Sequence, residues 1–192
     1  MIIALAGRRI DEPQTDIPRF PAENTSLVKH RLEKVFLEKH AEGVVCAAAC
    51  GADLIALEVA GNLKLKRRIV LPSSPESFRE SSVTDRPGNW GEIFDRIYEI
   101  LKKSGDVLVM NSNLKGNDLY LEANNEILNE AESLSVNFSG KSNRNALTNE
   151  SGAKVLTVIV WEGSPRGEDD ITKDFADKAR LRGFEVVEVL TK

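Results

Sequence analysis

The chain has 192 residues, of which 41% are hydrophobic and 29% are charged, a composition typical of a soluble globular protein with a full core. Its formal net charge is −4, and the Lys and Arg residues are spread among acids, which makes nucleic acid an unfavoured partner. No apolar run approaches the roughly 20 residues that span a bilayer, and the chain starts with a predicted strand instead of a basic leader. We therefore expect a cytoplasmic protein without a membrane partner.

Short apolar runs alternate with amphipathic helical stripes along the whole chain. This alternation predicts a single α/β domain over residues 1–192, with a Rossmann-like, three-layer arrangement in which helices flank a mainly parallel sheet of about six strands. The predicted strands cover residues 2–6, 43–48, 68–71, 107–110, 154–161 and 185–190. The predicted helices cover residues 25–40, 53–62, 76–81, 90–103, 118–134 and 172–182.

The first predicted strand runs directly into Gly7, Arg8 and Arg9. Arginine offers a fork of N–H donors that matches phosphate oxygens, so both arginines are candidate phosphate ligands. A surface ion pair explains either arginine, taken alone, equally well. The next segment, 10–23, contains three prolines and several acids, which predicts an ordered loop that supplies a further cation, Arg19.

A turn of small residues follows the second predicted strand and ends in Cys50, Gly51, Ala52 and Asp53. Small residues at a strand-to-helix turn let a ligand reach the backbone, and the N-terminus of the helix favours negative charge. We expect Asp53 to cap this helix through its carboxylate, and the same position can also contact a ribose hydroxyl. Cys50 is a candidate nucleophile, but no histidine lies near it in the sequence, and a packing role explains it better.

Further polar residues follow the third, fourth and fifth predicted strands. The candidate ligand contacts among them are Arg79, Ser82, Asn111, Asp118, Gly163 and Thr172. Because the carboxyl ends of parallel strands meet at one edge of a sheet, these residues and the two turns should line a single crevice. The sequence therefore predicts a binding site for a nucleotide or another phosphorylated small molecule.

The chain contains no complete catalytic motif of a hydrolase, kinase or dinucleotide-dependent enzyme. Its two histidines and two cysteines lack the spacing of a metal site, so we expect no metal and no cofactor. Glu58 is the candidate catalytic carboxylate for the alternative function, cleavage of the N-glycosidic bond of a nucleotide. Glu122 and Glu126 can play the same part, although a solvated helix face explains them better.

Residues 135–152 contain four Ser, four Asn and two Gly. Few apolar residues accompany them, so this segment offers little to a core. The composition predicts a flexible insertion between the fourth long helix and the fifth strand.

The chain resembles the SLOG superfamily, which unites DNA-processing proteins of natural transformation, Lonely-Guy cytokinin-activating enzymes and nucleotide sensors of bacterial conflict systems. The residues that carry the resemblance are 6–11, 19–21, 47–58, 70–72, 78–83, 118–120, Asn124 and 160–163. The resemblance implies a Rossmann-like sheet whose strand ends bind a nucleotide-derived ligand, most like the sensor members. It leaves room for a homodimer and for a separate effector protein.

Two segments depart from the superfamily pattern. Gly7, Arg8 and Arg9 stand where relatives commonly have Gly-His-Arg. Residues 167–172 keep one Gly and the Thr of the phosphate loop of the enzymatic members but add three acids, which repel phosphate. This second departure disfavours phosphoribohydrolase activity.

Overall fold

The computed structural model describes residues 1–142 and 154–192. The elements in chain order are β1 (Ile2–Gly7), η1 (Ala22–Asn24), α1 (Thr25–Glu38), β2 (Gly43–Cys46), α2 (Ala52–Asn62), β3 (Lys66–Leu71), α3 (Pro75–Ser82), α4 (Trp90–Lys103), β4 (Val107–Val109), α5 (Gly116–Ser142), β5 (Val155–Trp161), α6 (Ile171–Leu181) and β6 (Glu185–Leu190). Among these helices, none combines the length and the apolar character that crossing a membrane requires.

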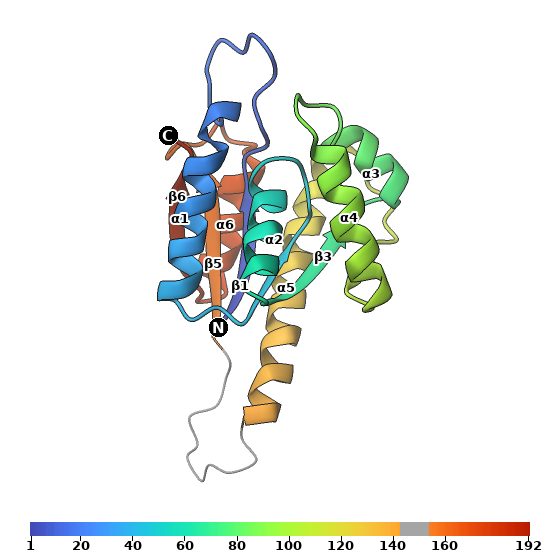
Figure 1. Cartoon of the computed structure of the whole chain (residues 1–192), viewed down its shortest axis with the longest axis vertical. Coiled ribbons are helices and arrows are strands. Elements are labelled where there is room, and N and C mark those ends of the chain that lie inside the picture. The colour runs from blue at the N-terminus through green and yellow to red at the C-terminus, as the bar shows by residue number, and fades with distance from the viewer. Residues whose placement is uncertain (143–153) are drawn as a thin grey trace.

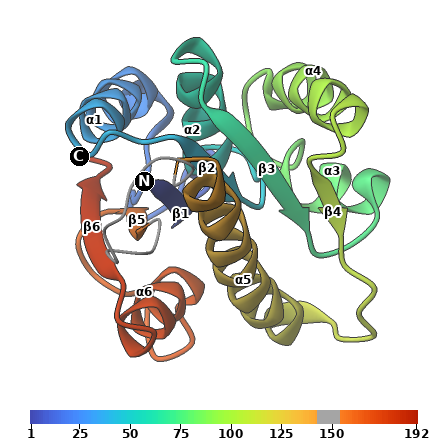
Figure 2. The ribbon, with the colours of Figure 1, turned by 90° about the horizontal axis from the view of Figure 1, so that it is seen from below.

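The six strands form one parallel sheet in the order β4-β3-β2-β1-β5-β6 (Figures 1 and 2). Ile2 of β1 pairs with Gly43 of β2 on one side and with Val155 of β5 on the other. The chain therefore builds the sheet outward from β1 to β4 and then returns to the opposite side of β1. This arrangement confirms the predicted Rossmann-like α/β fold. The reversal of strand order leaves a crevice at the carboxyl ends of β1 and β5.

Helices cover both faces of the sheet (Figure 2). Helices α1, α2 and α4 pack on one face and α5 and α6 on the other. Successive side chains of β1 alternate between the two cores: Ile3 and Leu5 pack with the first set of helices, whereas Ile2 and Ala4 pack with the second. Because a central strand is buried on both faces, it reads as an uninterrupted apolar run, which is the signal that located it in the sequence.

Strand β3 begins at Lys66, before the predicted start at residue 68. Two charged side chains fit into the beginning of this strand because each has an acidic partner. The Lys66 Nζ lies 2.6 Å from Asp106 Oδ2, and the Arg68 Nη1 lies 2.6 Å from Glu130 Oε2. Pairing with acids thus allows β3 to begin with charged residues, before the predicted start of the strand.

Helix α5 is longer than predicted, because it continues through Ser142. Residues 135–142 are therefore helical, which corrects the predicted insertion over this part of it. Phe138 is partly buried against the same core as Leu134 and continues the apolar stripe of the helix beyond its predicted end. The rest of the predicted insertion, 143–152, lies outside the described residues.

Gly7 ends β1 where the packing leaves no room for a side chain. A Cβ atom there would lie 2.5 Å from Ala52 Cβ and 2.7 Å from Val160 Cβ. We expect Gly7→Ala to lower the free energy of unfolding by about 1–3 kcal/mol, because β1 must move away from α2 and β5. Urea unfolding measures the loss. Gly61→Ala is the control, since its Cβ meets only the end of the Arg67 side chain and alanine favours a helix; equal losses would contradict the prediction.

Candidate functional site

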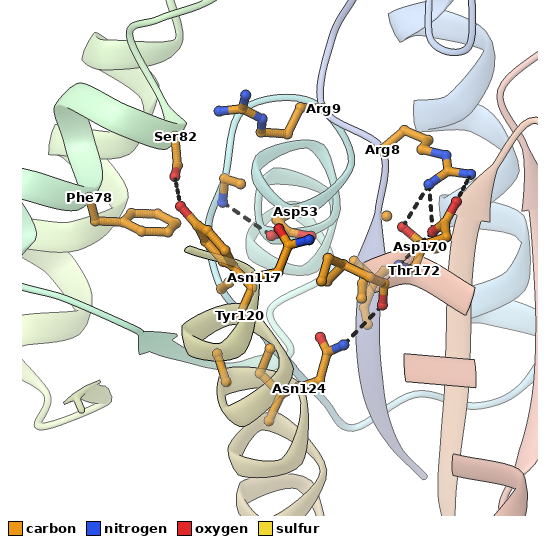
Figure 3. A pocket seen from close by; sticks show the side chains of 18 of the residues that line it. Arg8, Arg9, Asp53, Phe78, Ser82, Asn117, Tyr120, Asn124, Asp170 and Thr172 are labelled. Atoms are coloured by element: carbon orange, nitrogen blue, oxygen red, sulfur yellow. Dashed lines mark hydrogen bonds and ion pairs between the residues drawn. The ribbon is translucent and has the colours of Figure 1, made fainter. Parts of the chain in front are cut away.

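A cavity of about 450 Å³ lies at the carboxyl ends of the strands, beside the reversal of strand order between β1 and β5 (Figure 3). It is bounded by the end of β1, the β2–α2 turn, the end of α3, the first turns of α5 and the β5–α6 loop. The residues that line it are Leu5, Ala6, Gly7, Arg8, Arg9, Ala47, Ala49, Asp53, Phe78, Ser81, Ser82, Asn117, Tyr120, Ala123, Asn124, Ile127, Arg166, Asp169, Asp170, Ile171 and Thr172. Its size suits a small organic ligand.

The cavity brings together part of the predicted site. The predicted contacts that line it are Gly7, Arg8, Arg9, Asp53, Ser82 and Thr172. These residues come from four separate segments of the sequence, and the parallel sheet places the ends of those segments at one edge.

The β2–α2 turn takes its shape from contact with the loop after β1. Gly51, the N-cap residue of α2, has a φ of 88°, and a Cβ atom there would lie 2.8 Å from the carbonyl oxygen of Arg8. The Ala52 N–H donates a hydrogen bond to the same oxygen at 3.1 Å. Gly51 therefore lets two protein segments meet, in place of the close approach to a ligand that the sequence predicts. Ala52 is buried in this contact.

Cys50 lies in the same turn and is buried in the core. Burial raises the pKa of its thiol to about 12, so the group is neutral at physiological pH. A neutral, buried thiol is a poor nucleophile. The packing interpretation of Cys50 is therefore confirmed.

Asp53 is a buried carboxyl group in the wall of the cavity (Figure 3). The residue is 6% exposed. Its Oδ2 accepts a hydrogen bond from the Ala49 N–H at 3.1 Å, whereas its buried Oδ1 has no partner among the described residues. The predicted cap is wrong, because Gly51 is the N-cap residue and the Asp53 carboxylate bonds to the preceding turn. One bond thus orients the carboxyl, while its other oxygen stays without a partner among the described residues.

Burial raises the pKa of Asp53 to about 7, and the hydrogen bond from Ala49 opposes this rise only in part. The sulfur groups nearest to it, Cys46 and Cys50, are neutral because burial raises the pKa of each thiol as well. No opposite charge contributes to the pKa shift of Asp53, so ionisation of this buried carboxyl lowers the stability of the fold. Perturbed groups of this kind gather at functional sites.

Arg8 is only 2% exposed and uses all five of its N–H donors inside the protein. Its Nε and Nη2 donate to Glu162 at 2.6 and 3.2 Å, and Nη2 also donates to the Ser164 carbonyl at 2.9 Å. Its Nη1 donates to Asp170 at 2.8 Å and to Thr172 Oγ1 at 3.3 Å. This ion network joins β1 to β5 and α6, and it takes the place of the phosphate contact that the sequence predicts for Arg8.

Asp170 holds the β5–α6 loop in place as the N-cap residue of α6. Its Oδ1 accepts from the N–H groups of Thr172 and Lys173 at 2.8 and 3.1 Å, and its Oδ2 accepts from the Arg166 N–H at 2.6 Å. Burial by itself raises the pKa of Asp170, but hydrogen bonds from Arg8 and from the backbone outweigh it and lower the pKa to about 2. Asp170 is therefore ionised, and its charge is paired with Arg8 within the protein.

Two other arginines of the cavity keep N–H donors available. Arg9 donates from Nη1 to the Ser81 carbonyl at 2.9 Å and to Asp85 at 3.0 Å, and its Nε and Nη2 have no partner among the described residues. Arg166 is exposed, and within the described part of the chain its guanidinium makes no hydrogen bond or ion pair. Arg9 and Arg166 therefore give the cavity its available positive charge.

Aromatic and amide side chains form another wall of the cavity, at the left and centre of Figure 3. Phe78 comes from α3, and Tyr120 comes from α5 with its hydroxyl 3.1 Å from Ser82 Oγ. Asn117 and Asn124 lie on the same helix as Tyr120. Aromatic faces beside amides suit a planar ring that carries polar edges.

Other predicted residues have partners away from the cavity. Arg79 binds Asp95 through two hydrogen bonds of 2.8 and 2.9 Å. Glu58 pairs with Arg96 of α4 at 2.5 Å and is not a lining residue, so the structure does not place this candidate catalytic carboxylate at the site. The remaining predicted contacts that the lining does not include are Arg19, Cys50, Gly51, Ala52, Asn111, Asp118 and Gly163.

Arg19 joins the Arg8 network, because its Nη1 pairs with Glu162. Asn111, Asp118 and Gly163 are exposed on segments after β4 and β5. These three positions follow the strand ends as predicted, but they do not line the cavity. A residue that follows a strand in the sequence can thus be assigned to this edge of the sheet, but its place in or outside the cavity cannot be predicted in this way.

Fifteen of the 21 lining residues are not among the predicted ligand contacts, and the polar ones include Asn117, Tyr120, Asn124, Arg166 and Asp170. The first three recur at helical spacing near the start of α5, and that period is a signal for a shared face. Arg166 and Asp170 have no comparable local signal, because their roles depend on the contact of the β5–α6 loop with Arg8.

Among the described residues, no group of three His, Cys, Asp or Glu side chains gathers in a way that could hold a metal ion.

No protein-family model and no curated protein matches the chain. Among solved structures, the chain is similar to DNA processing protein A (DprA) from Streptococcus pneumoniae, with 12% sequence identity and a TM-score of 0.32. The match covers 98% of this chain, which spans 58% of that protein's chain. At this identity and TM-score the likeness assigns neither activity nor partners to the chain.

The ion network of Arg8 predicts a large effect on stability. Arg8→Met leaves the carboxylates of Glu162 and Asp170 buried without their main partner, so we expect the free energy of unfolding to fall by about 3–5 kcal/mol. Urea unfolding tests this. The control is Arg79→Met, which breaks an exposed pair with Asp95 and should change stability little. A loss at Arg8 no larger than at Arg79 would show that the network does not hold the fold.

Substitution of Asp53 is expected to raise the free energy of unfolding, whereas substitution of Arg8 is expected to lower it. The pKa of Asp53 in the folded protein, about 7, lies above the ordinary 3.8, so the stability of the natural protein falls as pH rises through this window and the buried group ionises. Asp53→Asn cannot ionise. We expect urea unfolding to show the variant more stable than the natural protein near pH 8, by a smaller margin near pH 5. A margin independent of pH, as expected for the exposed Asp16→Asn control, would contradict this.

Proposed function

We propose that the protein binds a nucleotide or a nucleotide-derived small molecule in this cavity. The observation that carries the proposal is Asp53, a buried carboxyl that lines the cavity and keeps one oxygen without a partner among the described residues. The fold accepts a destabilising group at this position, which is expected where a ligand supplies the missing partner. A ribose hydroxyl is such a donor, and an ionised carboxylate is a strong acceptor for it.

The other walls support the same class of ligand. Phe78 and Tyr120 offer aromatic surface for a base, and Arg9 and Arg166 offer N–H donors for an anionic group. The cavity lies at the strand-order reversal, where open α/β sheets bind nucleotides. The sequence resemblance to the SLOG superfamily implies a nucleotide-derived ligand as well.

We further propose that the protein acts as a sensor in a bacterial signalling or defence system, in the cytoplasm, and passes the occupancy of the cavity to a separate effector protein. This role follows from the resemblance to the sensor members of the SLOG superfamily. An ADP-ribose-like or cyclic nucleotide is the kind of signal such a cavity suits. A homodimer is compatible with this role.

One observation favours a second function, hydrolysis of an N-glycosidic bond. Burial raises the pKa of Asp53 to about 7, so near neutral pH part of the molecules carry its proton and part do not. In this reaction a water oxygen bonds to C1′ as the C1′–N bond breaks, and the Asp53 proton passes to the leaving base. The proton that the attacking water loses passes through solvent water back to the Asp53 carboxylate. The products are the free base and the ribose-containing part. Glu58, the sequence-based candidate for this role, pairs with Arg96 instead.

Isothermal titration calorimetry with ribonucleoside 5′-monophosphates, ADP-ribose and cyclic mononucleotides tests the binding proposal. We expect at least one of them to bind, and we expect Asp53→Asn to weaken its binding about ten-fold or more through loss of a charged hydrogen bond. Glu58→Gln is the matched control, because it removes a carboxylate outside the cavity and should leave the affinity unchanged. If no compound of the panel binds, the proposal is overturned.

Chromatography of the same mixtures separates binding from turnover. Release of free base by the natural protein and by Glu58→Gln, but not by Asp53→Asn, would establish the hydrolase. Binding without release of base would leave a binding module.

A further inference from the structure

Three arginines from three separate segments lie near one another, and two of them line the cavity. Arg9 follows β1, Arg86 lies between α3 and α4, and Arg166 belongs to the β5–α6 loop. Arg9 and Arg166 both line the cavity. Arg9 and Arg86 share one carboxylate oxygen: the Asp85 Oδ2 lies 2.9 Å from Arg9 Nη1 and 3.7 Å from Arg86 Nε.

The acids beside these arginines do not satisfy them. The Arg86 side chain is 16% exposed, and its buried Nε has no hydrogen-bond partner among the described residues, since 3.7 Å to Asp85 is too long for a hydrogen bond. Arg86 also pairs through Nη1 with Glu12. Arg9 uses only its Nη1, and Arg166 uses none of its guanidinium donors in the described part of the chain. Several N–H groups of the trio therefore have no partner among the described residues.

The three positive charges also act on one another. Burial, and then the charges of Arg9 and Arg166, lower the pKa of Arg86. Arginine remains cationic despite such a shift, so the protein carries the repulsion instead of relieving it by losing a proton. An anion placed among the three guanidinium groups would remove that repulsion and fill the vacant donors.

We infer that Arg9, Arg86 and Arg166 form a subsite for a phosphoryl group, so that the ligand of the cavity is a phosphate ester. Its phosphate would lie at the rim, and its uncharged part would reach inward to Asp53. This inference rests on the proposed function, and it names the charged group of the ligand and the residues that hold it. It also replaces the sequence-based phosphate contact of Arg8, which is bound to Glu162 and Asp170, and the sequence-based ligand contact of Arg79, which is bound to Asp95.

A purely structural role for the trio makes a different prediction. Asp85 and Glu12 belong to the two long loops that flank the rim, and the arginines would then serve only to hold these loops. Substitution would change stability but would not change how the protein distinguishes a nucleotide from its nucleoside. The ratio of the two affinities therefore separates the two roles.

The experiment compares AMP with adenosine by calorimetry, with the other three ribonucleotides and their nucleosides as further pairs and inorganic phosphate as a separate arm. In the natural protein we expect the nucleotide to bind more tightly than its nucleoside. In Arg166→Gln and in Arg86→Gln we expect that preference to fall about ten-fold or more, which corresponds to about 1.4 kcal/mol per factor of ten. Arg79→Gln is the matched control and should keep the full preference.

Arg166→Gln keeps the test valid if Arg86→Gln fails to fold, because Arg166 has no ion pair within the described residues to lose. Inorganic phosphate that competes with AMP and not with adenosine would support the subsite. Equal binding of nucleotide and nucleoside by the natural protein would overturn the inference while the proposed function stands. A preference that both variants retain would overturn the assignment of the trio. Failure of all nucleosides and nucleotides to bind, and of ADP-ribose and the cyclic mononucleotides as well, would overturn the proposed function and the inference together.

Discussion

Arg8 lies at the point where the strand order reverses, and its buried ion network fixes the surroundings of the cavity. A buried ion pair adds little net stability, because desolvation offsets much of the attraction, but removal of one partner leaves a buried charge that is strongly destabilising. Glu162 at the end of β5 and Asp170 at the start of α6 are both nearly inaccessible. Only an arrangement that brings β1, β5 and α6 together satisfies them. Asp170 in turn binds the Arg166 N–H, so the same network positions one wall of the cavity.

The polar groups of the site fall into two classes. In the network every guanidinium donor of Arg8 has a partner, whereas Asp53 Oδ1 and Arg86 Nε are buried without one among the described residues. Buried polar groups in folded proteins are normally satisfied, so the second class indicates where an external partner is expected. Its acceptor lies in the wall of the cavity, and its donor belongs to Arg86, which shares Asp85 with the lining residue Arg9. A molecule with hydroxyl groups at one end and an anionic group at the other complements this polarity.

The edge of the sheet that carries the site follows from the sequence, because strand periodicity and parallel connections place all the strand ends together. Which arginines face the cavity with unpaired donors does not follow from the sequence. Arg8 finds its partners 154 and 162 residues away, and no local pattern reports them. Arg79 and Arg166 look equally available in sequence, yet Arg79 is bound to Asp95, sixteen residues further along. The C-terminal part of α5 is also hidden in the sequence, because its polar composition hides the contact of Phe138 with the core.

The walls of the cavity differ in how firmly the protein holds them. The β5–α6 wall is anchored by fully buried charges, whose separation would leave carboxylates unpaired in the interior. The wall on the α3 side is joined to the loop after β1 through partly exposed pairs of Arg9 and Arg86 with Asp85 and Glu12, and such pairs contribute little stability. Adjustment to the proposed ligand would therefore fall to the α3 side, since its ion pairs can exchange a carboxylate for another anion at small free-energy cost. The α6 side sets the position against which that adjustment occurs.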